Sequence, residues 1–540
     1  MATVPGHELE PATRDLPAEV ELRTAAIEGR PVRRGDPQVA AISGGQAWGD
    51  DRIVRADLLF ELLARTESTQ KPRAVVLVGL RITGRLNFEA AELCAPLIAN
   101  NCYFDEPVNF TAARAPMIAL TACRLRGVAA DQLETRANLE LDRSVADTIS
   151  LLGAHIGGRL SLNGVAMAVG SYPLDLAEGG LRSAEVSDLR GALDGVSVMA
   201  HGLRVDGDMF CRDGFSAAGE VHLFGAHIVG VLVFDGATLS RGLFADGLRV
   251  DLGMLCRQGF SAGGEVRLLG GQVGGQLDFE RATLHEGLDA TGLRVEGDML
   301  CRDGFSANGE VRLFGAHIAG LLSFTWATLS RGLLADRLWV DGNMLCPEGF
   351  SADGEVRLAG AHIAGQLSFQ GATLHEGLEA AGLRVDGDML CGTVVSAAGQ
   401  VHAFSADGDV CLDGAQVGGK LAFEGATLRN RLDAERLRVD GSMLCVTFVC
   451  ADREVHRFSA DGEVRLSGAH IAGQLEFAGA ALGEVRLFDT HVGGLLVFVG
   501  ATLSHRLAAD GLQVDGPMLC QGFSSAGEVR LAGAHIGGQL

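Results

Sequence analysis

The sequence predicts an all-β solenoid with coils of about 22 residues and a small helical cap at its N-terminus. Three observations support this fold class. A cysteine recurs every 45 residues, short apolar triplets alternate with glycine turns, and residues 1–75 lack the repeat. We therefore expect a partly helical cap at 1–75, degenerate solenoid coils at 76–200 and regular coils at 201–540.

Composition agrees with an ordered, strand-rich protein. The 540 residues include 75 Gly, and 47% are hydrophobic but only 5% aromatic. The apolar content excludes disorder, and glycine does not recur at every third position, which excludes collagen. The formal charge of −23 disfavours direct nucleic-acid binding, because a phosphate-binding surface is usually basic.

The first 75 residues show one helical pattern. Asp50 or Asp51 is expected to cap a helix that runs to about Arg65, with an apolar stripe from Ile53 to Leu63. A solenoid needs its first coil shielded from solvent, so we expect this region to cover it. A separate partner-binding domain is the alternative.

A regular spacing of cysteines defines the repeat in residues 201–540. Five of them lie 45 residues apart: Cys211, Cys256, Cys301, Cys346 and Cys391. Cys445 and then Cys520 follow at longer intervals. We interpret the first excess as a second copy of a short segment (SAAGQVHAF, then SADGDV) and the rest as an inserted unit, ALGEVRLFDTHVGGLLVFVG.

Each of these repeat units divides into two similar halves of roughly 22 or 23 residues. Residues 359–377 align with 381–399, so that Phe369 falls on Cys391. Triplets such as V-x-L and L-x-F place apolar residues on one side of a very short strand, and glycine then breaks the strand. Short strands separated by turns predict the sides of a coil, and roughly 20 coils about 4.8 Å apart would span on the order of 100 Å.

The five-residue beat A-x-[LI]-x-x, as in AHIAG and ATLHE, resembles the pentapeptide-repeat proteins over roughly residues 76–540. This resemblance implies a right-handed, quadrilateral β-helix. Strict pentapeptide coils are slightly shorter than this unit, and sides of alternately five and six residues would account for its length. The segment Trp48–Ala56 (WGDDRIVRA) is also similar to long actinobacterial repeat proteins, some of which are labelled membrane-associated oxidoreductases, but no residue pattern here supports that label.

The regular cysteines are expected to be structural. Cys211, Cys256, Cys301, Cys346 and Cys391 align with phenylalanine in the sister half, which predicts an inward position. Neighbouring cysteines would lie two coils apart, roughly 9–10 Å, which is too far for a disulfide. No C-x-x-C pair occurs, so zinc or thioredoxin-like chemistry has little support.

A second column combines histidine and arginine at one slot of the repeat. The slot lies between two inward residues and therefore points outward. Its members are Arg204, His227, Arg249, Arg294, His317, His362, Arg384, Arg438, His470 and His535. A solvated face is one interpretation, and a binding strip for an acidic partner is the other.

Two sets of carboxylates have simpler interpretations. Pairs such as Asp386 and Asp388 bracket a glycine and are expected to form turns without a metal, because the nine-residue period of calcium-binding solenoids is missing. E-V-R triplets place Glu310 beside Arg312, and likewise Glu355 beside Arg357 and Glu463 beside Arg465, on one strand face as exposed ion pairs.

No catalytic motif is found, and every constellation recurs from copy to copy. The first hypothesis is therefore a non-catalytic scaffold or protein-interaction rod, with no cofactor, metal or small-molecule substrate. The alternatives are an acidic DNA mimic that binds a type II topoisomerase (gyrase), and membrane attachment as in the labelled relatives. The charge is uneven, since residues 301–345 are neutral and 346–390 carry −5, which weakens the DNA-mimic hypothesis.

Location and self-association complete the expectations. No signal peptide or membrane span is found, which predicts a cytoplasmic protein. The sequence stops in mid-coil at GAHIGGQL, so we expect either end-to-end stacking through the C-terminal coil or a fragment of a longer chain.

Overall fold

The computed structural model describes residues 16–35, 44–64, 71–167, 195–396, 399–450 and 454–539. It divides the chain into two units. Unit 1 contains residues 1–199 and 204–207, and unit 2 contains residues 200–203 and 208–540. Each unit is a parallel β-solenoid, and together they contain about 20 coils, which confirms the predicted fold class.

Unit 1 begins with two helices. Helix α1 (Pro17–Glu28) has proline in its first turn and ends at Gly29, whose φ of 71° gives the left-handed conformation that closes a helix. Helix α2 spans Ala56–Ala64. Strands β1 (Val32–Arg33) and β2 (Ile53–Arg55) lie between them and pair in parallel with β3 (Val75–Val78) and β4 (Arg81–Thr83), so this region supplies sides of the first coils.

The predicted helix from Asp50 begins too early. Residues Asp50–Arg52 form a 3-10 turn, and Ile53–Arg55 form β2. The β-branched Ile53 and Val54 pair with the exposed edge of β4, and this tertiary pairing outweighs their place in a helical stripe. The expected end at Arg65 lies outside the described residues, as do residues 168–194.

The remaining strands of unit 1 continue its four sides. They are β5 (Leu97–Asn100), β6 (Tyr103–Phe104), β7 (Val108–Asn109), β8 (Arg114–Ala115), β9 (Ile118–Thr121), β10 (Arg124–Leu125), β11 (Val128–Ala129), β12 (Glu134–Thr135), β13 (Leu139–Glu140), β14 (Val145–Ala146), β15 (Ile149–Ser150), β16 (His155–Ile156), β17 (Leu160–Ser161), β18 (Ala166–Met167), β19 (Val196–Met199) and β20 (Arg204–Val205). These strands pair in parallel with the corresponding strands of adjacent coils, as the equally spaced Leu97, Ile118, Leu139 and Leu160 illustrate.

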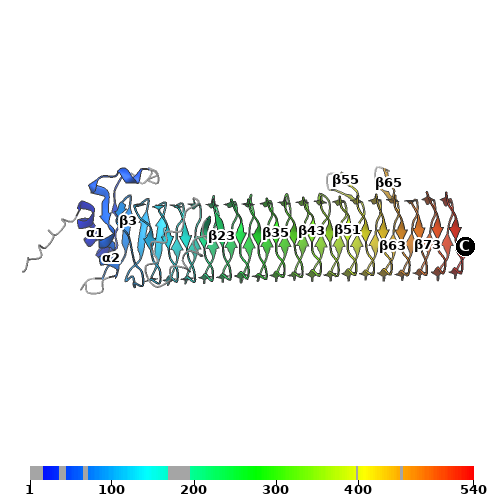
Figure 1. Cartoon of the computed structure of the whole chain (residues 1–540), viewed down its shortest axis with the longest axis horizontal. Coiled ribbons are helices and arrows are strands. Elements are labelled where there is room, and N and C mark those ends of the chain that lie inside the picture. Colours follow the sequence, from blue (N-terminus) through cyan, green and yellow to red (C-terminus); the bar gives the residue numbers. More distant parts are fainter. Residues whose placement is uncertain are drawn as a thin grey trace, which may run out of the picture. The chain divides into compact units, whose positions relative to one another are not determined.

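Unit 2 repeats a four-sided coil whose strands have only two residues, three in β23 (Glu220–His222). One coil contains β27 (Leu243–Phe244), β28 (Arg249–Val250), β29 (Met254–Leu255) and β30 (Ser261–Ala262). The next starts at β31 (Val266–Arg267), which pairs with β27 in parallel and in register. Figure 1 shows these coils stacked along one axis from β23 to β73.

Coil length alternates in unit 2. Along one side, Met254 pairs with Leu277, and Leu277 pairs with Met299, so the first of these coils is one residue longer than the second. The shorter coil has sides of five and six residues, as predicted. The longer coil places its extra residue at the corner that follows the cysteine.

The interior explains why cysteine and phenylalanine alternate. Phe279 follows its strand directly in the shorter coil, whereas Phe305 lies four residues after Cys301 in the longer one. The two rings nevertheless meet, with centroids 6.1 Å apart. A large ring from one position leaves room only for a small side chain at the other, so Cys301 occupies the position that Phe279 fills in the preceding coil. All these side chains are fully buried.

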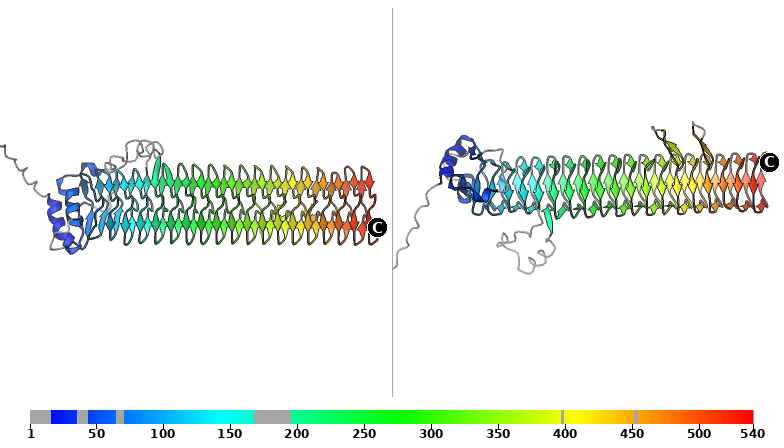
Figure 2. Two further views of the ribbon diagram at one scale, coloured as in Figure 1. Left: turned by 60° about the horizontal axis from the view of Figure 1, so that its bottom comes forward. Right: turned by 90° about the horizontal axis from the view of Figure 1, so that it is seen from above.

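Two β-hairpins interrupt the coils. The first hairpin pairs β54 (Val394–Val395) with β55 (Val401–His402), and the second pairs β64 (Phe448–Val449) with β65 (Val455–His456). They follow Cys391 and Cys445, at the corner that holds the extra residue in other long coils. Figure 2 shows both hairpins standing out from the coils.

The hairpins correct the interpretation of the irregular spacing. The extra residues after Cys391 form the first hairpin rather than a second copy of a coil segment, and the second hairpin was not anticipated. The inserted unit is a coil of its own, since β69 (Leu475–Glu476) pairs in parallel with β73 (Leu496–Val497) after one complete turn of the solenoid.

Candidate interaction surface

Because each strand turns one residue inward and one outward, each side of unit 2 presents one column of outward side chains. We name these sides by their columns. The leucine face comprises the outward residues of β41 (Leu322–Ser323), β45 (Met344–Leu345), β49 (Leu367–Ser368), β53 (Met389–Leu390), β59 (Leu421–Ala422) and β63 (Met443–Leu444), which are Ser323, Leu345, Ser368, Leu390, Ala422 and Leu444.

A second side carries hydroxyl groups. From Ser216 to Ser524, the outward position of every described strand on this side is serine or threonine, except Ala481. We call it the hydroxyl face. It is uncharged, and its alternation of serine with threonine follows the alternation of long and short coils.

The histidine face holds the predicted histidine and arginine column. Nine of the ten predicted residues form one parallel ladder in unit 2, and Arg204 pairs with His155 in unit 1. Five further members of the column were not predicted, because none of them is an arginine and none lies in a GAHI segment. The full column in unit 2 is His227, Arg249, Gln272, Arg294, His317, Trp339, His362, Arg384, Gln416, Arg438, His470, His491, Gln513 and His535.

Most histidines and arginines of this face contact carboxylates. His362 Nε2 lies 2.9 Å from Asp386, and Arg384 Nε donates to the same carboxylate at 2.8 Å. His227 and Arg249 contact Asp251 in the same way, at 2.9 and 2.7 Å. Each aspartate thus bridges the histidine of one coil and the arginine of the next. Because the carboxylates neutralise the arginines, the column is a mixed-charge face rather than a basic strip.

The pairing shifts the titration of the aspartates. Hydrogen bonds from Arg384 and then His362 hold the pKa of Asp386 below its usual range. Arg249 and then His227 lower the pKa of Asp251 similarly. These groups are partly exposed, so each pair contributes less than about 1 kcal/mol to stability.

The surface of the histidine face is hollowed at two coils in which glutamine replaces histidine. Gln272 and Gln416 are each followed by Val-Gly-Gly and flanked by arginines on both neighbouring coils. The short side chains leave shallow notches of about 420 and 110 Å³. Each notch contains two arginines and two carboxylates, so it carries no net charge.

The second aspartate of the Asp-Gly-Asp turns has a structural role. Asp388 Oδ1 accepts a hydrogen bond from the backbone amide of Lys420 in the next coil at 2.8 Å. Asp298 accepts from Leu321 at 2.8 Å, and Asp208 from Val231 at 3.0 Å. Among the described residues no group of three or more His, Cys, Asp or Glu side chains could hold a metal ion. These carboxylates therefore join coils at a corner.

The five regular cysteines lie in the interior, where their alignment with phenylalanine places them. Each is at most 1% exposed. Burial raises the pKa of Cys256, Cys301, Cys346 and Cys391, which keeps these thiols protonated and unreactive.

The fourth side is the ion-pair face, which carries the E-V-R triplets. Arg312 contacts Glu310 at 2.6 Å, and Arg465 contacts Glu463 at 2.5 Å, which confirms the pairing. The second pair is mostly buried rather than exposed as predicted. Arg357 and Glu355 are 4.0 Å apart. These triplets alone did not reveal that the pairs join into a network across successive coils.

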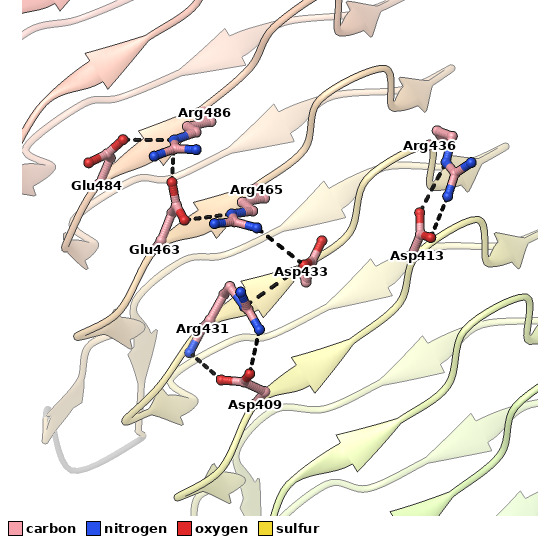
Figure 3. A network of polar contacts seen from close by, with 9 residues as sticks. All are labelled: Asp409, Asp413, Arg431, Asp433, Arg436, Glu463, Arg465, Glu484 and Arg486. Carbon is pink, nitrogen blue, oxygen red and sulfur yellow. Dashed lines mark hydrogen bonds and ion pairs between the residues drawn. The ribbon is translucent and has the colours of Figure 1, made fainter.

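Figure 3 shows one such network. Arg431 contacts Asp409 at 2.7 Å and Asp433 at 3.8 Å, and Arg465 contacts Asp433 at 3.7 Å. Arg486 extends the chain by contacting both Glu463 and Glu484. The ion-pair face, like the histidine face, thus satisfies its charges within the solenoid.

The two hairpins carry large exposed apolar side chains. Val395 is 43% exposed, Val449 60% and Val455 56%. On their inner side, Val394 and His402 lie against Gly371 of the preceding coil, where a Cβ would be 2.9 and 2.7 Å from them. The fold therefore holds the side of the first hairpin that carries Val394 and His402 against the coils. The side that carries Val395 is left in solvent.

A tryptophan continues the apolar surface at this corner. Trp326 is 45% exposed, and its ring meets the edge of the His402 ring with centroids 6.0 Å apart. It also covers Gly349, where a Cβ would collide with the indole ring at 2.2 Å. No sequence motif marks Trp326, since no other copy has tryptophan at this position.

Comparisons of the sequence and the structure with protein-family models, curated proteins and solved structures give no match. The described residues contain no helix that is long and apolar enough to cross a membrane. Membership of the pentapeptide-repeat group, right-handedness and cytoplasmic location stay predictions.

Proposed function

We propose that this chain is a non-catalytic β-solenoid scaffold that binds other proteins. The observation that carries this proposal is the pair of hairpins, which interrupt a regular coil and expose Val395, Val449 and Val455. An insertion that adds apolar surface without adding buried core costs stability, and such surface commonly marks a protein contact. The hairpins, with Trp326 beside the first, are the surface on which we expect partners to bind.

Repetition supports a binding role over catalysis. The charged groups of the histidine and ion-pair faces recur in successive coils and are paired with one another. An active site requires one distinct constellation with a perturbed environment, whereas these pairs stabilise the coil stack. The same pairing does not favour a DNA mimic, which needs a continuous track of unpaired negative charge.

The experiment replaces both hairpins with a turn that the chain already uses. Residues 392–403 and 446–457 are each exchanged for Arg-Asp-Gly, which links Cys301 to Phe305 in a regular coil. Proteins captured from the source cell by the wild-type chain and by the variant are then compared by quantitative mass spectrometry. We expect the specific partners to fall at least about 10-fold, because the exposed valines anchor them.

Two controls make the result decisive. The variant must keep the thermal midpoint of the wild-type chain, since its corners copy a native one. Phe314→Ser removes an exposed apolar side chain from another corner and should leave the captured set unchanged. Equal capture by the hairpin variant would contradict the proposal. Salt-sensitive recovery of a topoisomerase by both chains would favour the DNA-mimic alternative.

A further inference from the structure

The leucine face differs from the other three sides because its outward column is uncharged and carries a leucine in every second coil. Leu345, Leu390 and Leu444 are half-buried and point away from the core, while Met344, Met389 and Met443 of the same strands point inward and are fully buried. A parallel sheet with apolar residues on both faces is typically covered on both faces. In unit 2 the core covers only the inner one.

This column also alternates in size. Ser323, Ser368 and Ala422 are each 3% exposed and lie in register between the leucines of the adjacent coils. With coils about 4.8 Å apart, the leucines form ridges roughly 9.6 Å apart, separated by pits. The two-coil period follows from the alternation of cysteine and phenylalanine inside, because leucine precedes cysteine and the small residue precedes phenylalanine.

The corners beside this face carry little charge. Between Leu321 and Val446, the corner residues next to the column are mostly uncharged, with Glu348, Asp388, Lys420 and Glu424 as exceptions. The first and second hairpins rise from the same border, directly after the strands that carry Leu390 and Leu444. A molecule seated on the leucine face would therefore meet apolar side chains at its edge as well.

We propose that a second copy of this chain covers the leucine face, with the leucine ridges of each copy in the pits of the other. The ridge spacing selects this occupant, because a partner must present protrusions at the same two-coil period along its whole length. The chain itself is such a surface, and an antiparallel pair related by a two-fold axis is self-complementary. This inference rests on the proposed function, of which self-association is one form.

Charge and area agree with this occupant. Two chains of net charge −23 repel each other, and the nearly neutral leucine face lets them meet without close like-charge contacts. Six coils about 4.8 Å apart and about 15 Å wide offer roughly 400 Å² per copy, to which the hairpins add. Counted over both copies this is about 800 Å², which is less than a standard specific interface buries, so we expect a weak dimer with a dissociation constant in the micromolar range or above.

Sedimentation equilibrium of the full chain, from about 1 to about 200 µM, tests the inference. The chain mass is 56.4 kDa, and we expect the weight-average mass to approach twice that value as concentration rises. The test variant combines Ser368→Glu and Ala422→Glu, which place a carboxylate in two pits. We expect its dissociation constant to rise at least about 100-fold, because a charge would be buried unpaired at the interface.

The substitutions should leave the coil intact. Glu476 occupies the equivalent position of β69, so this ladder accommodates a glutamate. The matched control combines Thr373→Glu and Thr427→Glu on the hydroxyl face, which add the same charge in the same two coils and should leave a chain that dimerises like the wild type. Thermal midpoints of all variants verify that they are folded.

Three results would overturn the inference. The wild-type chain could remain a monomer at the highest concentration, or the double variant could dimerise as well as the wild-type chain. Loss of the dimer only on Val529→Glu, in the last coil, would assign the contact to the C-terminal coil instead. None of these results affects the hairpin experiment, which measures capture of other proteins, so the two proposals can fail separately.

Discussion

Units 1 and 2 build the same four-sided coil from differently organised sequences. Along one side of unit 1 the residues Leu97, Ile118, Leu139 and Leu160 follow at equal intervals. Phe88 and Phe110 occupy the same position, so their rings stack 5.7 Å apart at 5°. In unit 2 the coils alternate, and Phe279 and Phe305 come from different positions, so their rings tilt by 55°. The alternation of cysteine and phenylalanine inside unit 2 thus changes the angle between neighbouring phenylalanine rings.

The same alternation reaches the surface only in unit 2. Outward residues of the corresponding ladder in unit 1 are Ile98, Ala119, Glu140 and Ser161, which show no two-coil period. The comparison teaches that a double-coil repeat gives a surface a second period, twice the distance between coils. A single-coil repeat cannot do this, since every coil then presents the same residue.

Breaking the interior alternation should have the largest effect. Phe350→Ala removes a fully buried ring that contacts Phe324 and Phe369, and we expect a loss of about 3–5 kcal/mol in the free energy of unfolding. Urea unfolding followed through Trp326 and Trp339 measures it, because both lie in unit 2. A loss below about 1 kcal/mol would mean that the coils repack around the gap.

Unit 1 should instead be most sensitive at a buried ion pair. Glu19 is fully buried and accepts hydrogen bonds from Arg55 Nη2 at 2.6 Å and from the Leu16 amide at 2.9 Å. Burial alone would raise the pKa of Glu19, but the hydrogen bonds from Arg55, Leu16 and the Arg55 amide outweigh it and lower the pKa. We expect Glu19→Gln to cost about 2–3 kcal/mol.

Fluorescence of Trp48, in unit 1, reports this loss during urea unfolding when Trp326 and Trp339 are replaced by Phe in the variant and in the reference chain. The matched control is Glu61→Gln, which removes an exposed carboxylate 3.1 Å from Arg23 and should cost less than about 1 kcal/mol. Equal effects of the two substitutions would show that burial of Glu19 contributes nothing.

A polar atom in the interior should have an intermediate effect. Cys346→Ser puts a hydroxyl where the structure has a fully buried thiol, and we expect a cost of about 1–3 kcal/mol. The same substitution at the half-buried Cys520 should cost less, because its hydroxyl can reach water. Differential scanning calorimetry compares the two variants, and equal midpoints would argue against an apolar interior site.

The histidine face should give the smallest effect, and only in acid. Since the pKa of Asp386 is lowered in the folded chain, its pair stabilises the fold above the ordinary aspartate pKa of about 4, and this contribution is lost as pH falls below it. Thermal midpoints between about pH 3 and pH 6 should fall less steeply for Asp386→Asn than for the wild-type chain. Parallel curves would contradict the pairing with Arg384 and His362.

Much of the coil could be predicted because its rules are local. Inward and outward positions follow from the two-residue period of a strand, which places Cys346 inside and His362 outside without knowledge of neighbouring coils. The histidine column was found for the same reason. Its pairing was missed, although His362 lies in register with Arg384 of the next coil, and one step along that strand face reaches Asp386.

The hairpins and the β2 strand could not be predicted in this way. Residues 393–403 have no counterpart in the regular coils and align only with 447–457, so the coil pattern gives no guide to their fold, and β2 forms because a neighbouring strand offers an edge. The leucine face is visible in the sequence as three consecutive apolar residues, Met344-Leu345-Cys346. A search for alternating apolar and polar residues does not detect such a run. Such a run indicates a strand that is apolar on both faces.

The sequence by itself determined the coil, its inward residues and the chemistry of each column, because side-chain direction and turn positions depend on adjacent residues. Only the tertiary structure decided which side chains meet across coils, where the hairpins lie and that Leu345, Ser368 and Leu390 form ridges and pits on one side. Those relations depend on the number of residues per coil. That number is set at the corners, where a coil with a buried cysteine such as Cys346 needs one more residue to bring Phe350 against Phe369.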